Sequence, residues 1–320
     1  MTVLDRTHLP QQRSKTAAAL GATAVAVAVT LGGAVGTAAA DTVVDTIDVG
    51  WYLSGMAITP DGKHIYITDQ GNGTDYSSGR VFVIDTAHPT DTPTTIPVGQ
   101  NPRGVAITPD GKHAYVTIGG DSRVSVINTT DNTVDPTTIP VGQNPRDVAI
   151  TPDGGHAYVT NSDDNTVSVI NTSNNTGTPA TIPVGQNPNN VAITPDGKHA
   201  YVTNGGDNTV SVINTSDNTV DPTAIPVGQS PNGVAITPNG SRAYVTNLGA
   251  RTVSVINTSD NTVDPTTLPV GWDAHQVEIT PDGKHAYVMN SESSSVTVIA
   301  IDQAPQSTGS LGSLGPIFGS

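Results

Sequence analysis

The chain has 320 residues, no cysteine, 4% aromatic residues and a formal net charge of −15, with 33 glycines and 24 prolines. This acidic balance argues against a nucleic-acid or anionic-membrane partner, because both are polyanions. The absence of cysteine excludes disulfides, iron–sulfur clusters, thiolate zinc sites and c-type haem attachment.

The first forty residues differ in character from the rest. Arg6, Arg13 and Lys15 precede an Ala-rich apolar stretch at residues 16–35, and the small residues 38–40 follow. This order is typical of a secretory signal peptide, so we expect cleavage before Asp41 and a secreted or cell-surface-associated protein. A retained membrane anchor is the weaker alternative, since the core is built of Ala, Gly and Val rather than Leu. No transmembrane segment is expected after cleavage.

Residues 41–302 are built from one repeated unit. The phrase NPRGVAITPDGKHAYVT, which starts at Asn101, returns in close form from Asn144, Asn187 and Ser230, and more loosely from Tyr52 and Asp273. A Val-Gly pair comes just before each copy of the phrase, and its glycine stands at positions 50, 99, 142, 185, 228 and 271. The period is therefore 43 after a first spacing of 49. A period near 43 predicts one four-stranded β-propeller blade per unit.

The strands can be assigned within one unit. Residues 104–108 and 113–117 flank the turn Pro-Asp-Gly, residues 123–128 form the third strand, and residues 133–141 form the fourth. The fourth strand contains Pro136 and Pro140. Since proline cannot donate to a β-ladder, this strand is predicted to lie at the outer rim of the blade.

The last unit ends with its third strand at residues 296–302. Residues 42–49 align with 134–141, so the N-terminal strand is predicted to complete the last blade and close a six-bladed ring. Seven blades are the alternative, although no seventh copy of the unit is found. The tail at residues 303–320 is rich in Gly and Ser and is predicted to be disordered, and the protein is expected to be a monomer.

One motif resembles a known family. AYVT recurs at Ala114, Ala157, Ala200 and Ala243, each time followed by VSVIN and then by IPVG or LPVG. The sequence is similar to YVTN-type β-propeller repeat proteins, which are related to surface-layer and lactonase-like propellers. The resemblance implies the fold and leaves the function open, because propellers serve as binding modules, hydrolases, lyases and redox enzymes.

Most of the polar residues belong to the repeat. Five histidines share one position of the unit, and so lie once per blade, far from each other: His64, His113, His156, His199 and His285. A metal site needs ligands within a few ångströms of one ion, so no metal and no cofactor are predicted. The tyrosine of AYVT is predicted to pack between blades, with its hydroxyl near a rim.

Function is better sought where the units differ. The loop that reads GQNPRG in the second unit holds both tryptophans of the chain in the first and last units, which become neighbours when the ring closes. The residues expected to gather there on one face are Trp51, Tyr52, Tyr76, Trp272, Asp273, His275 and Glu278, with Asp69 and Asp75 beside them.

Three functions fit this pattern. The preferred hypothesis is a surface or secreted module that binds a protein or a carbohydrate, with Trp51, Tyr52, Tyr76, Trp272, Asp273 and His275 as the ligand-binding set. A structural alternative is that the tryptophans only fill the joint between the blades. The enzymatic alternative is a lactonase or lyase. His275 would then be the acid or base, Glu278 or Asp273 its partner, and Arg103 or Arg146 the holder of an anionic group. A quinone- or metal-dependent oxidoreductase is not favoured, because the sequence lacks the ligands that such an enzyme needs.

Overall fold

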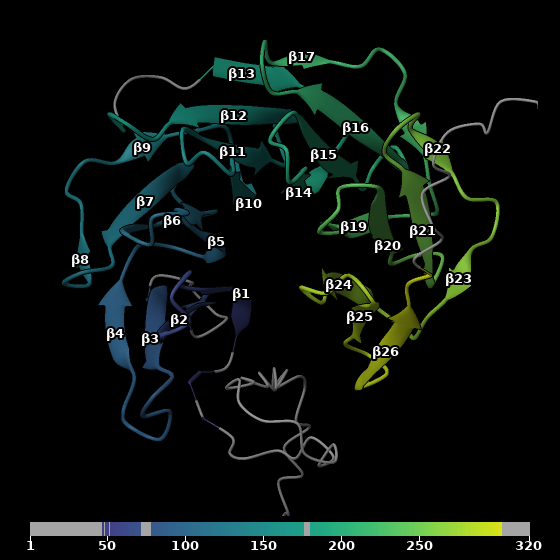
Figure 1. Cartoon of the computed structure of the whole chain (residues 1–320). Helices are drawn as coiled ribbons and strands as arrows, with labels where there is room; N and C mark the ends of the chain where they lie inside the picture. Colours follow the sequence, from purple (N-terminus) through teal and green to yellow (C-terminus); the bar gives the residue numbers. More distant parts are fainter. Residues whose placement is uncertain (1–46, 48, 51, 72–77, 176–179, 303–320) are drawn as a thin grey trace, which may run out of the picture.

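The computed structural model describes residues 47, 49–50, 52–71, 78–175 and 180–302. These residues form six antiparallel sheets placed around a central axis, so the fold is the predicted all-β, six-bladed propeller (Figure 1). We number the sheets blade 1 to blade 6 in chain order. The inner strands β1, β5, β10, β14, β19 and β24 surround the axis, and each contacts the next inner strand along the chain.

Each blade runs from an inner strand outwards. The inner strands are β1 (Leu53–Ile58), β5 (Pro102–Ile107), β10 (Pro145–Ile150), β14 (Pro188–Ile193), β19 (Pro231–Ile236) and β24 (Ala274–Ile279). The second strands are β2 (His64–Asp69), β6 (His113–Ile118), β11 (His156–Asn161), β15 (His199–Asn204), β20 (Arg242–Asn247) and β25 (His285–Asn290). The third strands are β3 (Arg80–Asp85), β7 (Arg123–Asn128), β12 (Thr166–Asn171), β16 (Thr209–Asn214), β21 (Thr252–Asn257) and β26 (Ser295–Ala300).

The Thr-Pro-Asp-Gly sequence makes the first hairpin of a blade. In blade 2, Asp110 Oδ1 accepts hydrogen bonds from Thr108 Oγ1 at 2.6 Å and from the Lys112 N–H at 3.0 Å. Gly111 follows with φ 73°, a left-handed conformation in which a side chain would be strained. The hairpin therefore depends on the repeated Asp-Gly pair, and its lysine and histidine are turn and strand-edge residues.

The outer strand lies at the rim as predicted, but its predicted continuity is wrong in three blades. Blades 1 and 3 have one short outer strand, β4 (Thr94–Pro97) and β13 (Ala180–Pro183). In blade 2, Asp135 still donates its N–H to Val126 at 2.8 Å, and Pro136 then has no N–H to continue the ladder. The outer strand consequently divides in blades 2, 4 and 5 into β8 (Thr133–Val134) with β9 (Ile139–Pro140), β17 (Thr219–Val220) with β18 (Ile225–Pro226), and β22 (Thr262–Val263) with β23 (Leu268–Pro269).

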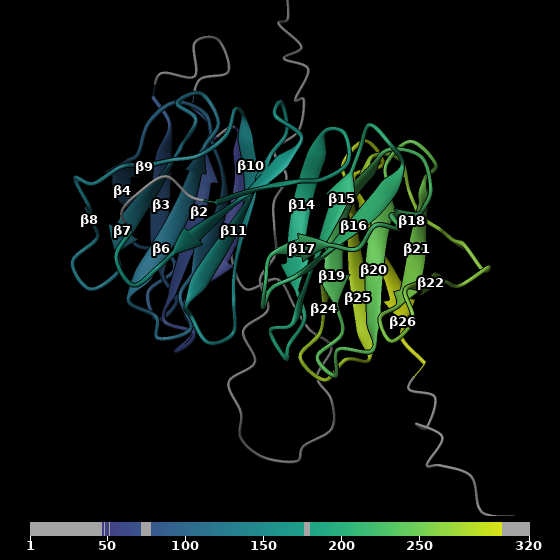
Figure 2. The same ribbon diagram turned by 90° about the horizontal axis from the view of Figure 1, so that it is seen from above.

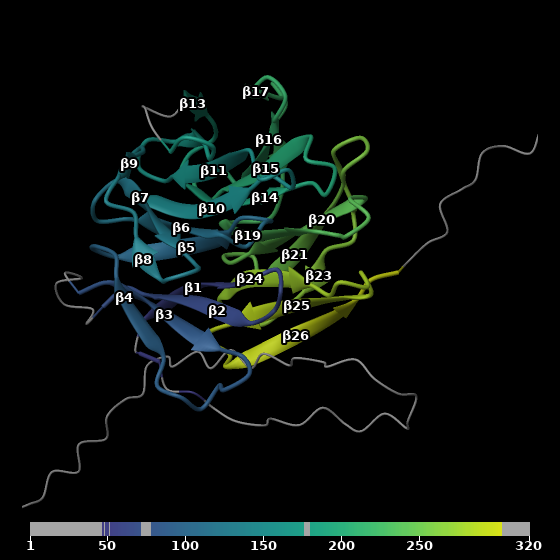
Figure 3. The same ribbon diagram turned by 60° about the vertical axis from the view of Figure 1, so that its left-hand side comes forward.

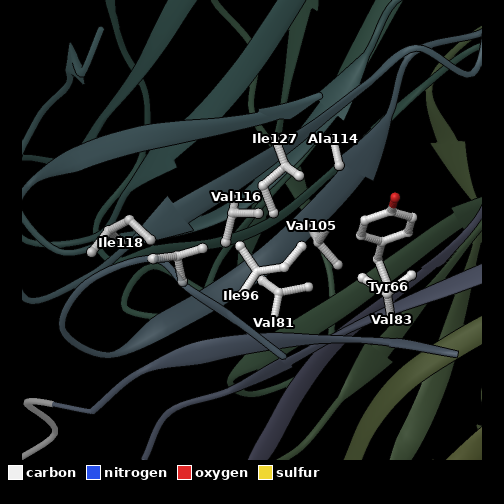
Figure 4. Close-up of a cluster of buried hydrophobic side chains, with 10 residues drawn as sticks. Tyr66, Val81, Val83, Ile96, Val105, Ala114, Val116, Ile118 and Ile127 are labelled. Carbon is white, nitrogen blue, oxygen red and sulfur yellow. The ribbon is translucent and has the colours of Figure 1, made fainter. Parts of the chain in front are cut away.

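The hydrophobic core lies between the blades. Tyr66 and Val81 of blade 1 pack against Val105 and Val116 of blade 2, all fully or almost fully buried (Figure 4). The hydroxyl of Tyr66 donates to Asn132 Oδ1 of blade 2 at 2.7 Å. The predicted role of the repeat tyrosine between blades is thus confirmed, and the same packing recurs between later blades.

The junction between blade 6 and blade 1, which we call the seam, differs from the others. Blade 6 has three strands among the described residues, and β26 forms its edge (Figure 3). Tyr287 is 44% exposed there, whereas the corresponding tyrosines of blades 1–5 are buried. The predicted closing strand, residues 42–49, lies outside the described residues except for Ile47 and Val49, which pack on blade 1. Within the described ranges, no helix is long and apolar enough to cross a membrane.

Candidate functional site

One position of the repeat lies around the central axis at one end of the inner strands, and we call this end the mouth. It is the second residue of each inner strand, next to a β-bulge that shifts the register with the second strand, for example between Pro145 and Val148. All six copies lie at the same end of their strands, on the face that carries the loops between second and third strands (Figure 2). The residues in this position are Ser54, Arg103, Arg146, Asn189, Asn232 and His275.

Blades 2 and 3 make the mouth basic on one side. Arg103 and Arg146 are partly buried, and burial lowers the pKa of Arg146 while the charge of Asp163 opposes that effect. Asp163 accepts a hydrogen bond from Asn144 Nδ2 at 3.0 Å, which is the main reason that its pKa is lowered, and both guanidinium groups act in the same direction. The Nε of Arg146 is buried and has no hydrogen-bond acceptor among the described residues. A partly desolvated guanidinium of this kind suits a carboxylate or phosphate ligand.

Blade 6 presents a histidine and a carboxylate at the same mouth. His275 Nε2 lies 3.0 Å from Asp273 Oδ2, and the two side chains are 43% and 24% exposed. Asp273 has φ 59°, the left-handed conformation that asparagine or serine adopts at this point of blades 2–5. Because a carboxylate only accepts hydrogen bonds, Nε2 of His275 donates to Asp273, which in a neutral imidazole leaves the lone pair on Nδ1. This is the arrangement of a general base with its orienting group.

An aromatic platform lies beside this pair. Trp272 is 53% exposed, and its backbone N–H donates to Ser293 Oγ at 2.6 Å. The guanidinium of Arg251 from blade 5 stacks over the indole of Trp272. Arg251 has φ 56°, which is uncommon for an arginine. A stacked Arg–Trp pair leaves the other ring face available to a ligand.

Two carboxyl groups lie on the inner strands β10 and β24, beyond the position of Arg146 and His275. Asp147 accepts hydrogen bonds from Asn190 Nδ2 at 2.7 Å and from the Val191 N–H at 3.1 Å. Burial raises the pKa of Asp147 to about 7, hydrogen bonds from the backbone N–H groups of Val191 and Val148 oppose that change, and the charge of Glu278 adds to it. Desolvation also raises the pKa of Glu278, although this residue is exposed to solvent in the structure. The charge of Glu278 on blade 6 therefore acts on Asp147 of blade 3, on the opposite side of the ring.

The predicted site residues are only partly brought together. Trp272, Asp273 and His275 lie together on blade 6, while Glu278 lies further along β24, opposite Tyr287 of β25. Tyr52 is exposed on blade 1, across the seam. Asp69 is buried in an ion pair with Arg80, so it supports the blade. Trp51, Tyr76 and Asp75 lie outside the described residues.

Two residues of the mouth were missed from the sequence. Asp163 replaces a glycine present at the same place in blades 2, 4 and 5, and Arg251 replaces the serine or asparagine of blades 2, 3, 4 and 6. Comparison of the loops between second and third strands would have found both. In the parts of the chain that the structure describes, no three His, Asp or Glu side chains are placed to hold a metal ion.

Comparisons with known proteins support the propeller and its lactonase resemblance. The family described as "Lactonase, 7-bladed beta-propeller" matches residues 184–311. Hydrazine synthase of Kuenenia stuttgartiensis is similar at 25% identity and a TM-score of 0.71, over 81% of this chain and 86% of that one. A candidate 6-phosphogluconolactonase of Bacteroides fragilis is similar at 19% identity and a TM-score of 0.67, over 81% and 83%.

A second candidate 6-phosphogluconolactonase, from Bacteroides uniformis, is similar at 17% identity and a TM-score of 0.68, over 81% and 84%. At such identities these two likenesses establish the fold alone. No curated protein matches the sequence. The chain is a six-bladed β-propeller whose last blades resemble those of the lactonase propellers.

Proposed function

We propose that the protein is a lactonase-type hydrolase that acts at the mouth, where the inner strands begin, on a lactone that carries an anionic group. The observation that carries this proposal is one repeat position, which holds His275, paired with Asp273, on one side of the mouth and Arg103 and Arg146 on the other. The lactonase match is consistent with it, because residues 184–311 include the histidine and its aspartate.

The residues suit a water-mediated ring opening. His275 Nδ1 would take a proton from water as its oxygen attacks the lactone carbonyl carbon, and Asp273 would stabilise the resulting imidazolium. The ring C–O bond then breaks, and the imidazolium returns the proton to the leaving alkoxide, so the product is a hydroxy acid. Arg103 and Arg146 would hold the anionic group of the substrate and so fix its orientation.

The experiment compares two histidines of the same blade. Hydrolysis of a phosphorylated or carboxylated aldonolactone is followed by acid release, with His275→Ala and with the matched control His285→Ala, which alters β25 at the opposite face. We expect His275→Ala to lower kcat by about 100-fold or more, and His285→Ala to leave it unchanged.

A charge control tests the arginines. Arg146→Gln should raise KM for the anionic lactone and leave hydrolysis of an uncharged lactone of the same ring size unaltered. Equal turnover of both lactones by wild type and His275→Ala would refute the proposal.

The second candidate function is recognition of a protein or carbohydrate, which is favoured by the exposed Trp272 stacked with Arg251. An indole of this exposure can stack on the apolar face of a sugar. Screening an oligosaccharide panel for changes in tryptophan fluorescence would test it. If Trp272→Ala abolishes binding while no lactone is hydrolysed by the wild type, the protein is a binding module.

A further inference from the structure

The loop between the second and third strands of blade 3 differs from its counterparts in blades 2 and 4. Ser162 and Asp163 stand where each of those blades has two glycines. In blade 2 the first glycine leaves room for the mouth residue of its own blade, because a Cβ atom at Gly119 would lie 3.0 Å from Arg103 Nε. This loop therefore adjoins the mouth side chain of its blade, which in blade 3 is Arg146.

Hydrogen bonds fix the carboxylate of Asp163 within this loop. Its Oδ1 accepts hydrogen bonds from Asn144 Nδ2 and from Ser162 Oγ, both at 3.0 Å. The backbone N–H groups of Ser162 and Asp163 donate to the carbonyls of Asn144 and Gln143 at 3.2 Å and 3.3 Å. Ser162 is buried, whereas Asp163 is exposed. Asp163 thus places one negative charge in a defined position at the surface of the mouth.

This negative charge acts on both arginines of the mouth. The hydrogen bond from Asn144 is the main reason that the pKa of Asp163 is lowered, and the charges of Arg146 and Arg103 lower it further. Burial lowers the pKa of Arg146, and the charge of Asp163 opposes this change. Two positive charges and one negative charge are therefore coupled here, and together they leave one positive charge for a ligand.

The size of this remaining charge favours one kind of anion. The attraction of an anion to a positive site grows in proportion to the charge of the anion, whereas the cost of removing it from water grows with the square of that charge. A weakly positive, partly buried site therefore prefers a singly charged carboxylate to a phosphate ester, which carries about −1.5 to −2 at pH 7. The formal net charge of −15 on the whole chain acts in the same direction.

The guanidinium of Arg146 also suits a carboxylate in its shape. Its Nε is buried and has no hydrogen-bond acceptor among the described residues. The two oxygens of one carboxylate can accept parallel hydrogen bonds from the Nε and an Nη of the same guanidinium. One planar, singly charged group would then satisfy both the donor and the remaining charge.

We propose that Asp163 is a specificity-determining residue, which makes the arginine side of the mouth select a carboxylate rather than a phosphate. Its fixed carboxylate repels the second negative charge of a phosphate held by Arg103 and Arg146. This inference rests on the proposed function, because it names the anionic group of the substrate. The substrate of the proposed reaction is accordingly a lactone that carries a carboxylate.

The experiment measures anion binding without turnover. The Nε–H resonance of Arg146 is followed by proton–nitrogen NMR of the full chain at pH 7 and low ionic strength, and it is assigned by its loss in Arg146→Gln. Acetate and methyl phosphate are the two probes. We expect the wild type to bind acetate with the lower Kd. Asp163→Asn should shift the ratio of the two Kd values by about 3- to 10-fold towards methyl phosphate, as one unit charge at a distance of several ångströms near a surface would do.

A matched control separates the position of the charge from its sign. Glu292 stands at the position of Asp163 in blade 6, on the other side of the ring. Glu292→Gln removes the same charge from the chain and should leave the ratio of the Kd values unchanged.

A lower Kd for methyl phosphate than for acetate in the wild type would overturn the inference. Equal changes of the ratio in Asp163→Asn and Glu292→Gln, or no response of the Arg146 resonance to either anion, would overturn it as well. If the ratio changes as expected while no lactone is hydrolysed, the proposed function fails and the selectivity of the site for carboxylates is supported.

Discussion

The carboxyl group of Asp147 provides a direct test of the electrostatics at the inner strands. Its carboxyl group is partly buried and has a pKa raised to about 7 from an ordinary value of 3.8. A raised pKa means that the folded state binds this proton more tightly than the unfolded state does. The contribution to stability is therefore fully present below pH 4, and it is lost as the pH rises from about 4 to about 7.

The size of the effect follows from the two pKa values. Their difference corresponds to at most about 4 kcal/mol of unfolding free energy, and solvent screening of this partly buried group reduces this to about 2–4 kcal/mol. Asp147→Asn removes the ionisation but keeps an acceptor. Asn190 occupies the same position of blade 4 and is such a neutral acceptor, because its Oδ1 accepts a hydrogen bond from the Val234 N–H at 3.1 Å.

The assay is urea unfolding followed by circular dichroism at pH 5 and pH 8. We expect the unfolding free energy of Asp147→Asn to exceed that of the wild type by about 2–4 kcal/mol at pH 8 and by much less at pH 5. This window lies above the titration of the turn aspartates, such as Asp110, whose pKa is lowered by a hydrogen bond from Thr108. Their stabilising contribution is lost only as the pH falls below about 4.

Two variants complete the test of Asp147. Glu278→Ala, which restores the alanine of the other blades, should lower the pKa of Asp147. It should thereby reduce the unfolding free energy that ionisation of Asp147 costs at pH 8. Asn190→Asp, which adds a carboxylate beside Asp147, should destabilise the protein most at pH 8. Equal stability of wild type and Asp147→Asn at pH 8 would refute the reasoning.

Three further predictions concern stability. Tyr158→Phe should lower the unfolding free energy by about 1 kcal/mol, through loss of its bond to the next blade, whereas Tyr287→Phe at the seam should change it little. Arg80→Met leaves Asp69 buried without its cation and should cost about 3 kcal/mol; a loss below 1 kcal/mol would contradict the ion-pair assignment. Asn239→Asp supplies the carboxylate found in the other five hairpin turns and should leave the melting temperature unchanged or raise it slightly, as measured by calorimetry.

Most of the fold follows from sequence periodicity, because a hairpin turn and a strand alternation repeated six times leave little freedom to each unit. Pro136 and Pro140 were sufficient to place the outer strand, and the missing N–H of Pro136 explains why that strand divides. The arginines at 103 and 146 and the histidine at 275 were also identified correctly as sharing one position.

The site could be foreseen less well. Asp147 was not predicted as a site residue, and the β-bulge between Pro145 and Val148 interrupts the strand alternation from which the direction of its side chain would be predicted. Asp163 and Arg251 lie on loops, where propensity carries little information, and their roles depend on contacts with neighbouring blades. Glu278 was expected near His275, but its position on β24 places it further from the mouth.

The side-chain hydrogen bonds that recur between blades, such as Thr117 Oγ1 to the Arg146 carbonyl and the Tyr66 hydroxyl to Asn132, have an evolutionary consequence. Because each internal interface uses the same donor and acceptor positions, the loss or gain of one whole 43-residue unit leaves every remaining contact matched. Duplication by recombination between such similar gene segments would then change the diameter of the ring without requiring a compensating substitution. Met289, which stands in blade 6 where blades 1–5 have a threonine, and Pro89, which stands in blade 1 where blades 2–5 have an asparagine, are among the residues that set the end blades apart from the internal ones.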